Sequence, residues 1–230
     1  KRSVKSFALL PRCDAGATEV AQYAVQGFIT SQFELDKYKT KDKNTKTVNA
    51  LLLCIDGAKP AALKDGIARG ESMNLTRDLA NEPPNILQPT EMGKRAQAMA
   101  KSVGLKCEVY DEAWMIKQGM GSLMSVTLGS TQPAKLIVLR YTPAKSTAKK
   151  GELLALVGKG VTFDTGGISL KPGEGMDAMK YDMSGAATVI GTMRAIALLK
   201  PSIPVLGVIA AVENMPDGGA SRPADVVTAM

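Results

Sequence analysis

The sequence predicts a layered α/β fold, and three observations support this prediction. Apolar residues recur at helical spacing in several stretches, beginning with residues 17–33. Several short runs are apolar at nearly every position, which is typical of strands that are covered on both faces. The 230 residues, 45% of them hydrophobic, are enough to form a substantial core.

The first part of the chain predicts two helices and a strand. A helix over residues 17–33 precedes a lysine-rich segment at 37–46, and the apolar run "TVNALLLCI" at 47–55 predicts a strand. A long helix over 59–85 ends at Pro83 and Pro84, because proline cannot continue a helix. We expect a domain boundary just before this long helix or at the double proline.

After the prolines, helices and strands alternate. The predicted helices run from Thr90 to about Val103, from Glu112 to Lys117 and from about Ser184 to Leu199. The predicted strands are residues 106–110, 122–129, 134–141, 152–160 and 204–214. Active residues of such sheets gather where strands end and loops begin, so the glycine-rich stretch after 152–160 is the place to look for a site.

Composition excludes several kinds of protein. No run of about 18 apolar residues appears, so a membrane-spanning helix is not expected. Cys13, Cys54 and Cys107 are scattered and form no CxxC, which disfavours a disulfide framework or a zinc knuckle and favours a reducing cytoplasm. The net charge of +7 comes largely from the segments at 37–46 and 144–150, which we interpret as solvated loops, leaving DNA binding as a weaker alternative.

The stretch "GKGVTFDTGGISLKPGEGMDAMKYDMSGAA" at 158–187 carries the candidate site. No P-loop pattern occurs, and the GxGxxA string at 173–178 follows no strand, so phosphate and dinucleotide binding are disfavoured. The chain has no histidine, so it cannot form a Ser–His–Asp or Cys–His arrangement. Ser184 is interpreted as a helix N-cap rather than a nucleophile.

Metal binding remains as the chemistry of this stretch. Lys159 ends an apolar strand, Asp164 follows beyond a loop, and Asp182 begins the next helix. A lysine beside a dication loses its proton readily and then donates its lone pair, and carboxylates suit Zn²⁺, Mn²⁺ or Mg²⁺. Lys171 would instead stabilise an oxyanion. The alternative, which spacing leaves equally open, is an ordinary ion pair of Asp164 with Lys159 or of Asp182 with Lys180.

The same residues resemble those of the leucyl aminopeptidases, also called cytosol aminopeptidases. The stretch from Val157 to Ala187 resembles the first metal motif of that family. The segments "RDLANEPPN" at 77–85, "GMGSLMSVTLGS" at 119–130 and "ENMPDGGASRPADVVT" at 213–228 resemble further family segments in the same order. Ala224 replaces the usual glycine of "RPGD", a change that we expect to cost little.

The resemblance implies a fold and a domain organisation. Residues 1–57 would be the end of a smaller α/β N-terminal domain. Residues 58–230 would be the linking helix and part of a three-layer α/β/α catalytic domain, whose central sheet is mixed, largely parallel and incomplete. The family's second motif, NTDAEGRL, is absent from the 230 residues. We therefore expect a fragment that is inactive alone, or a catalytically silent chain with a role in binding or assembly.

The resemblance also implies a function and its residues. Lys159, Asp164 and Asp182 would bind two divalent ions, Zn²⁺ or Mn²⁺, and Lys171 would be the catalytic lysine that polarises the scissile carbonyl. Met179 would line the pocket for the first side chain, so these five residues would contact the substrate. That substrate would be a peptide with a free, leucine-like N-terminal residue. The complete protein would be a cytoplasmic homohexamer whose missing motif positions a bicarbonate ion, and some bacterial members also bind DNA.

Overall fold

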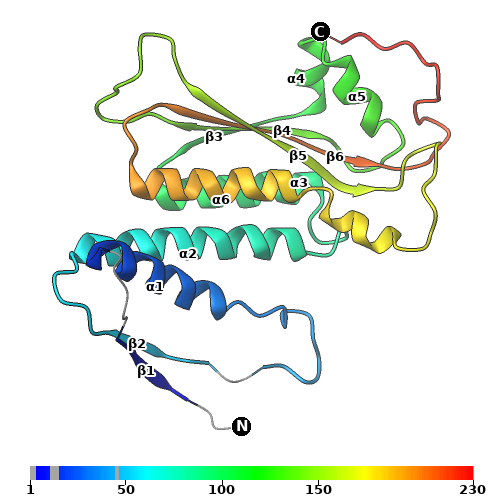
Figure 1. Ribbon diagram of the computed structural model, residues 1–230. Coiled ribbons are helices and arrows are strands. Elements are labelled where there is room, and N and C mark those ends of the chain that lie inside the picture. Colours follow the sequence, from blue (N-terminus) through cyan, green and yellow to red (C-terminus); the bar gives the residue numbers. More distant parts are fainter. Residues whose placement is uncertain (1–3, 11–15, 45–46, 230) are drawn as a thin grey trace. The chain divides into compact units, whose positions relative to one another are not determined.

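The computed structural model describes residues 4–10, 16–44 and 47–229. Its contacts divide the chain into two compact units at Leu75 and Thr76, which lie within helix α2. The assignment of residues 1–57 to a separate N-terminal domain stays a prediction. The elements of both units are shown in Figure 1. They are β1 (Ser6–Leu9), α1 (Ala17–Ser31), β2 (Ala50–Leu53), α2 (Pro60–Asn81), α3 (Pro89–Val103), β3 (Lys106–Tyr110), α4 (Glu112–Lys117), α5 (Gly121–Thr127), β4 (Lys135–Tyr141), β5 (Leu154–Asp164), the 3₁₀ helix η1 (Met176–Tyr181), α6 (Ser184–Leu199) and β6 (Val205–Asn214).

The first unit is a two-stranded sheet with helix α1 and the beginning of α2. Strands β1 and β2 pair in parallel, with Phe7 opposite Leu51. The two helices approach closely at Gly66 and Gly70, where a β-carbon would lie only 2.5 Å from the Gln22 carbonyl oxygen and 2.9 Å from the Ile29 side chain. The glycines therefore permit a helix contact that larger residues would prevent.

The second unit is built on a mixed four-stranded sheet in the order β3-β4-β6-β5. β4 runs antiparallel to both of its neighbours, β3 and β6, whereas β5 and β6 are parallel. Three of the four strands thus share one direction. The expected mixed, layered α/β sheet is confirmed, and β5 forms one of its edges.

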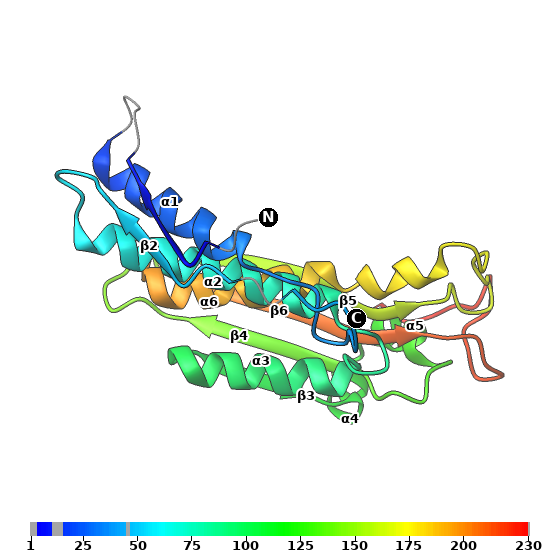
Figure 2. The same cartoon turned by 90° about the horizontal axis from the view of Figure 1, so that it is seen from below.

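Helices cover both faces of this sheet. α3 and α6 lie side by side on one face, as Figures 1 and 2 show, and pack on β4, β5 and β6. On the other face, Met115 of α4 packs in a buried cluster with Leu136 and Val138 of β4. Ile137 and Leu139, which alternate with these residues along β4, are fully buried. The alternation explains why β4 is apolar at nearly every position.

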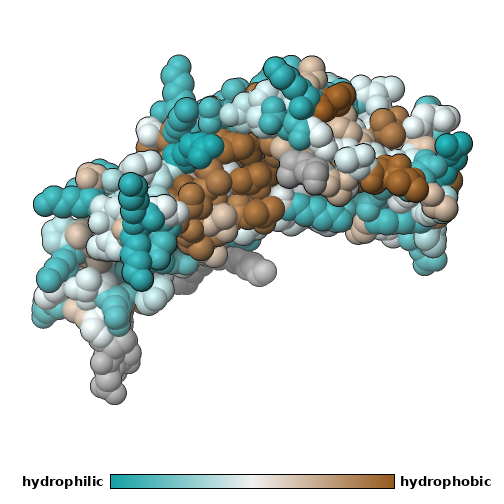
Figure 3. All heavy atoms as spheres, turned by 90° about the horizontal axis from the view of Figure 1, so that it is seen from above, coloured by the Kyte–Doolittle hydropathy of each residue, from teal (hydrophilic) through white to brown (hydrophobic). Residues whose placement is uncertain are grey.

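One part of the sheet face that carries α4 and α5 is open. Figure 3 shows a large apolar patch on this side of the molecule. Val157 of β5, which pairs with Val208 of β6, has 78% of its surface exposed. None of the helices in the described residues has the length and apolar composition needed to span a bilayer.

The strand expected at residues 122–129 is wrong, because the chain forms helix α5 there. Met120, Leu123 and Met124 pack on the core cluster, and Thr127 is buried. Counted from Met120, the other three residues lie three, four and seven positions further on, which is the spacing of one face of a helix. The apolar and β-branched residues of this run favoured a strand, but packing of one helical stripe on the sheet decides the outcome.

Three smaller expectations also need correction. Strand β5 does not end at Lys159 but continues to Asp164, because β6 pairs with it as far as Asn214. Ser184 is the first residue of α6 rather than its N-cap, and its hydroxyl donates to the Tyr181 carbonyl at 2.6 Å. Ala224 has a φ of 74°, in the left-handed region that favours glycine, so its replacement of glycine carries a conformational cost. Cys54 and Cys107 are free thiols, whereas Cys13 lies outside the described residues.

Candidate metal centre

Lys159 lies within strand β5, opposite Ala210 of β6. Its ammonium nitrogen is 2.9 Å from Asp182 Oδ2, and its side chain is 59% exposed. Asp182 comes directly after η1 and shortly before α6, so a strand and a helix start supply the two partners. Lys159 and Asp182, two of the three candidate metal ligands, are thus in direct contact.

Backbone contact between β5 and α6 sets this distance. A β-carbon on Gly158 would lie 2.6 Å from the Gly185 carbonyl oxygen, and one on Gly185 would lie 2.9 Å from the Lys159 nitrogen. Real β-carbons do not approach other atoms so closely, so both positions require glycine. These two glycines let the beginning of α6 lie directly against the strand that carries Lys159.

Asp164, the last residue of β5, accepts three hydrogen bonds. Its Oδ2 lies 2.7 Å from Lys171 Nζ, and its Oδ1 accepts from the Gly166 amide at 3.0 Å and from Asn214 Nδ2 at 2.7 Å. Partial burial raises the pKa of this carboxyl. The hydrogen bonds from Lys171, Gly166 and Asn214 together outweigh that effect and hold its pKa below the usual value. Asp164 is therefore held as a carboxylate.

The loop between Asp164 and Lys171 turns back on itself. Thr165 donates from both its amide and its hydroxyl to the Asn214 carbonyl, at 3.0 and 2.8 Å, and the Lys171 amide donates to the Thr165 carbonyl at 2.9 Å. Gly166 and Gly167 have φ values of 89° and 67°, which glycine adopts without strain. The tight turn returns Lys171 to the carboxylate seven positions before it.

Met179 of η1 joins the two ion pairs. Lys171 Nζ is 3.0 Å from Met179 Sδ, and the Met179 carbonyl accepts from the Asp182 amide at 3.3 Å. The five candidate residues thus form two ion pairs that are linked through Met179: Asp164 and Lys171 lie at the carboxyl end of β5, whereas Lys159 meets Asp182 near the middle of that strand. The pairs that form are Asp164 with Lys171 and Asp182 with Lys159, not the pairs of the alternative interpretation. Lys180 Nζ instead lies 4.8 Å from the Tyr181 ring centroid.

Lys159, Asp164 and Asp182 are suitable ligands for a divalent cation, although they supply only part of a metal coordination shell. Asp182 Oδ2 is buried and accepts no hydrogen bond, since its contact with Lys159 lacks hydrogen-bond geometry. A buried carboxylate oxygen without a hydrogen bond is costly unless a cation lies beside it; here the Lys159 ammonium does so at 2.9 Å, and a metal ion could take its place. Asp164 and Asp182 offer hard oxygen ligands, and Lys159 offers a nitrogen once it loses its proton. Within the described residues, no group of three or more His, Cys, Asp or Glu could hold a metal.

Asn214 is a site residue that the sequence interpretation missed. It is the last residue of β6, and besides holding Asp164 it places its Oδ1 where a β-carbon on Gly167 would come within 2.9 Å. The signal was available, because a polar residue ends an apolar strand at the edge where Asp164 lies. Glu213 beside it is engaged elsewhere, accepting from the Ser130 hydroxyl at 2.5 Å.

A comparison with protein families decides what kind of domain carries this site. The catalytic domain of the cytosol aminopeptidase family, Peptidase_M17, matches residues 74–230, which is more than half of the chain. The chain belongs to the cytosol aminopeptidase family. The resemblance noted in the sequence is therefore confirmed, and the matched residues include all five candidate site residues.

Curated relatives bear names of this family. A "Probable cytosol aminopeptidase" of Solibacter usitatus is 50% identical over 233 residues, covering 100% of this chain and 47% of the relative. The "Cytosol aminopeptidase" of Pseudomonas aeruginosa is 47% identical over 215 residues, covering 91% of this chain and 43% of the relative. The chain thus spans about half the length of these cytosol aminopeptidases.

A solved structure has the same fold. The bottromycin maturation enzyme BotP, described as in complex with Mn, superposes with a TM-score of 0.85 at 34% identity. The match covers 98% of this chain and 47% of BotP. The similarity extends over both units of the chain, and it agrees with an α/β catalytic domain of the cytosol aminopeptidase family.

Proposed function

We propose that the complete protein is a metal-dependent aminopeptidase that releases N-terminal, leucine-like residues from peptides. The single observation that carries this proposal is the pair of contacts beside strand β5, Lys159 with Asp182 and Lys171 with Asp164, in a chain of the cytosol aminopeptidase family. The names of the relatives support an aminopeptidase, and the description of BotP supports a metal.

Lys159, Asp164 and Asp182 would hold two divalent ions, Zn²⁺ or Mn²⁺. When bound, such ions supply Lewis acidity at the first peptide carbonyl and favour ionisation of water. Lys159 has to give up its proton to act as a ligand, and a neighbouring dication favours that loss. Asp164 is already ionised beside Lys171, so it is ready to bind a cation.

Lys171 would act on the substrate rather than on the ions. Its ammonium lies 2.7 Å from Asp164 and contacts Met179, so its charge is held at the site by two partners. A substrate carbonyl oxygen placed there would gain negative charge during attack, and a fixed positive charge stabilises that change most. We assign Met179 to the pocket for the first side chain of the peptide, since its thioether lies beside Lys171.

We also propose that the complete protein is a cytoplasmic homohexamer and that a bicarbonate ion assists the reaction, in line with the family resemblance. The 230-residue chain alone would be inactive, because the described residues supply only part of a metal shell.

The test uses the complete product of the reading frame with leucine p-nitroanilide and Mn²⁺ or Zn²⁺, and with EDTA as a metal-free control. Lys171→Ala and Asp182→Ala should each lower kcat/KM at least about a hundredfold, which corresponds to about 2.7 kcal/mol. Lys180→Ala is the matched control and should change kcat/KM less than about threefold, because this lysine contacts Tyr181 rather than the site. Full activity of both site variants would contradict the assigned roles.

A further inference from the structure

A second pocket lies at the opposite end of strands β5 and β6 from the candidate metal centre. It has a volume of about 630 Å³ and is formed by the ends of α3 and α6, the loop after β4 and the turn before β6. α6 has 16 residues and separates the two places by about 24 Å at 1.5 Å per residue. The pocket is therefore independent of the proposed catalytic function.

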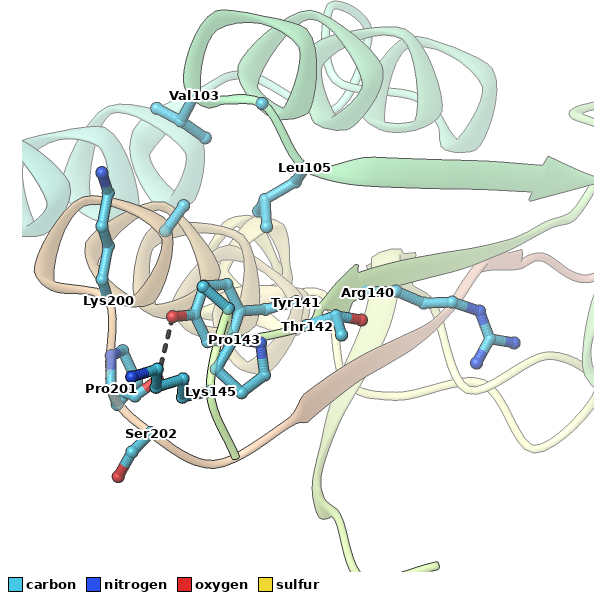
Figure 4. Close-up of a pocket in the computed structure, with 13 residues that line it drawn as sticks. Val103, Leu105, Arg140, Tyr141, Thr142, Pro143, Lys145, Lys200, Pro201 and Ser202 are labelled. Carbon is cyan, nitrogen blue, oxygen red and sulfur yellow. Dashed lines mark hydrogen bonds between the residues drawn. The ribbon is translucent and has the colours of Figure 1, made fainter. Parts of the chain in front are cut away.

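Hydrogen bonds hold the walls of this pocket together. The Tyr141 hydroxyl donates to the Pro201 carbonyl at 2.9 Å, as Figure 4 shows, and the Thr147 amide donates to the Ser202 carbonyl at 2.8 Å. The end of β4 and the loop after it are thus each bonded to the turn that follows α6. The pocket is preformed, and its volume falls in the range of small-molecule sites.

The charged residues of the pocket are all basic. Arg140, Lys145 and Lys200 line it, and no acidic residue is among its lining residues. Arg140 forms an ion pair with Glu108 at 3.3 Å and points away from the other lining residues in Figure 4. In the described part of the chain, neither Lys145 nor Lys200 forms an ion pair, so the pocket has two exposed ammonium groups without an anionic partner.

The helix ends reduce this positive charge but do not cancel it. α3 and α6 both end at the pocket, and the carbonyl groups of a helix C-terminus act as about half a negative charge each. Two such ends amount to about one negative charge, against two full positive charges from the lysines. The backbone of Lys200 is fixed in the left-handed conformation, with its amide donating to the Ile196 carbonyl at 2.9 Å.

The remaining lining is largely apolar. Val103, Leu105 and Tyr141 form part of it, and the two lysines come from different walls, the loop after β4 and the end of α6. A ligand with one apolar part and a compact dianionic group would contact both features. Lysine binds phosphate as a point charge, and a phosphate monoester carries nearly two negative charges above pH 7.

We propose that this pocket binds a small organic phosphate monoester, with its phosphate between Lys145 and Lys200 and its apolar part against Val103, Leu105 and Tyr141. The basic segment at 144–150 then has a specific role through Lys145, whereas Lys149 and Lys150 do not line the pocket. A polyanion such as DNA is disfavoured, because these two unpaired charges line a pocket instead of following an extended track.

The test is calorimetric titration of the full chain at pH 8 and constant ionic strength, with phenyl phosphate, inorganic phosphate and phenol as probes. Phenyl phosphate should bind saturably and at least about fivefold more tightly than inorganic phosphate, and phenol should not bind. Lys145→Gln with Lys200→Gln should weaken phenyl phosphate binding about tenfold, as expected for the loss of two exposed charges. Lys149→Gln with Lys150→Gln, the matched control in the same loop, should change it less than about twofold.

Several results would overturn the proposal. An equal loss in both double variants would mean that the phosphate responds only to the general charge of the loop. If inorganic phosphate bound as tightly as phenyl phosphate, the apolar residues of the pocket would contribute nothing to binding. If duplex DNA competed with phenyl phosphate and required the same two lysines, the lysines would belong to a polyanion-binding surface instead. If titration up to about 5 mM phenyl phosphate gave no heat of binding, the proposed site would not exist.

Discussion

Replacing Asn214 by alanine tests whether this residue positions Asp164. The substitution removes a 2.7 Å hydrogen bond to an ionised carboxylate and leaves the bonds from Gly166 and Lys171 in place. Hydrogen bonds to charged groups contribute about 1.5–3 kcal/mol, and partial exposure of this pair favours the lower value. With a urea dependence of roughly 2 kcal/mol per molar, a loss of about 1.5 kcal/mol lowers the unfolding midpoint by about 0.75 M.

The single tryptophan makes this shift measurable. Trp114 lies in the second unit and stacks on Tyr110 with ring centroids 4.0 Å apart, so its fluorescence follows unfolding of the unit that contains Asn214. Mn²⁺ affinity of the complete protein is the second readout and should fall about tenfold or more, as for other residues that orient a metal ligand.

Asn81→Ala is the matched control, because the Asn81 side chain contacts Tyr181 and the Arg77 carbonyl but not Asp164. It should leave Mn²⁺ affinity unchanged. If Asn214→Ala had the same urea midpoint and the same Mn²⁺ affinity as the unaltered protein, the reasoning would be refuted.

Two further predictions concern a thiol and a backbone conformation. Burial, followed by the negative charge of Glu108, raises the pKa of Cys107 to about 11, so its thiolate forms only as the pH approaches that value. Iodoacetamide at pH 8 should therefore modify Cys107 far more slowly than the exposed Cys54, with urea abolishing the difference, and equal rates in the folded chain would disprove this. Ala224→Gly should stabilise the second unit by about 0.5–1 kcal/mol in urea unfolding, because φ is 74° there. Ala220→Gly, at a residue without positive φ, should give no gain, and a gain equal to that of Ala224→Gly would argue against the backbone explanation.

Much of the fold could be predicted from the sequence, because most elements have a clear period and a clear end. Helix α6 begins and ends at the expected Ser184 and Leu199, and α4 matches residues 112–117. The error at α5 arose because a short apolar run fits both the helical and the strand period. Only the packing of this run against Met115 and Val212 distinguishes a helix from a strand. The extension of β5 depends on pairing with β6, which a local pattern does not contain.

The candidate site was predictable as a set of residues but not as a set of contacts. Lys159, Asp164, Lys171 and Asp182 stand out by residue type and by resemblance. Which aspartate meets which lysine depends on the turn after Asp164 and on the contact between β5 and α6. Asn214 is 50 positions from Asp164, so only the register of the parallel strands brings the two together.

The glycine contact between β5 and α6 has a consequence for engineering. The main chains of Gly158 and Gly185 touch, so neither position offers a side chain that could be trimmed or enlarged to tune the gap between Lys159 and Asp182. The distance between these two candidate metal ligands is therefore set by the path of the main chain. A variant with room for a larger cation would have to be sought through insertions or deletions around the start of α6, not by remodelling side chains.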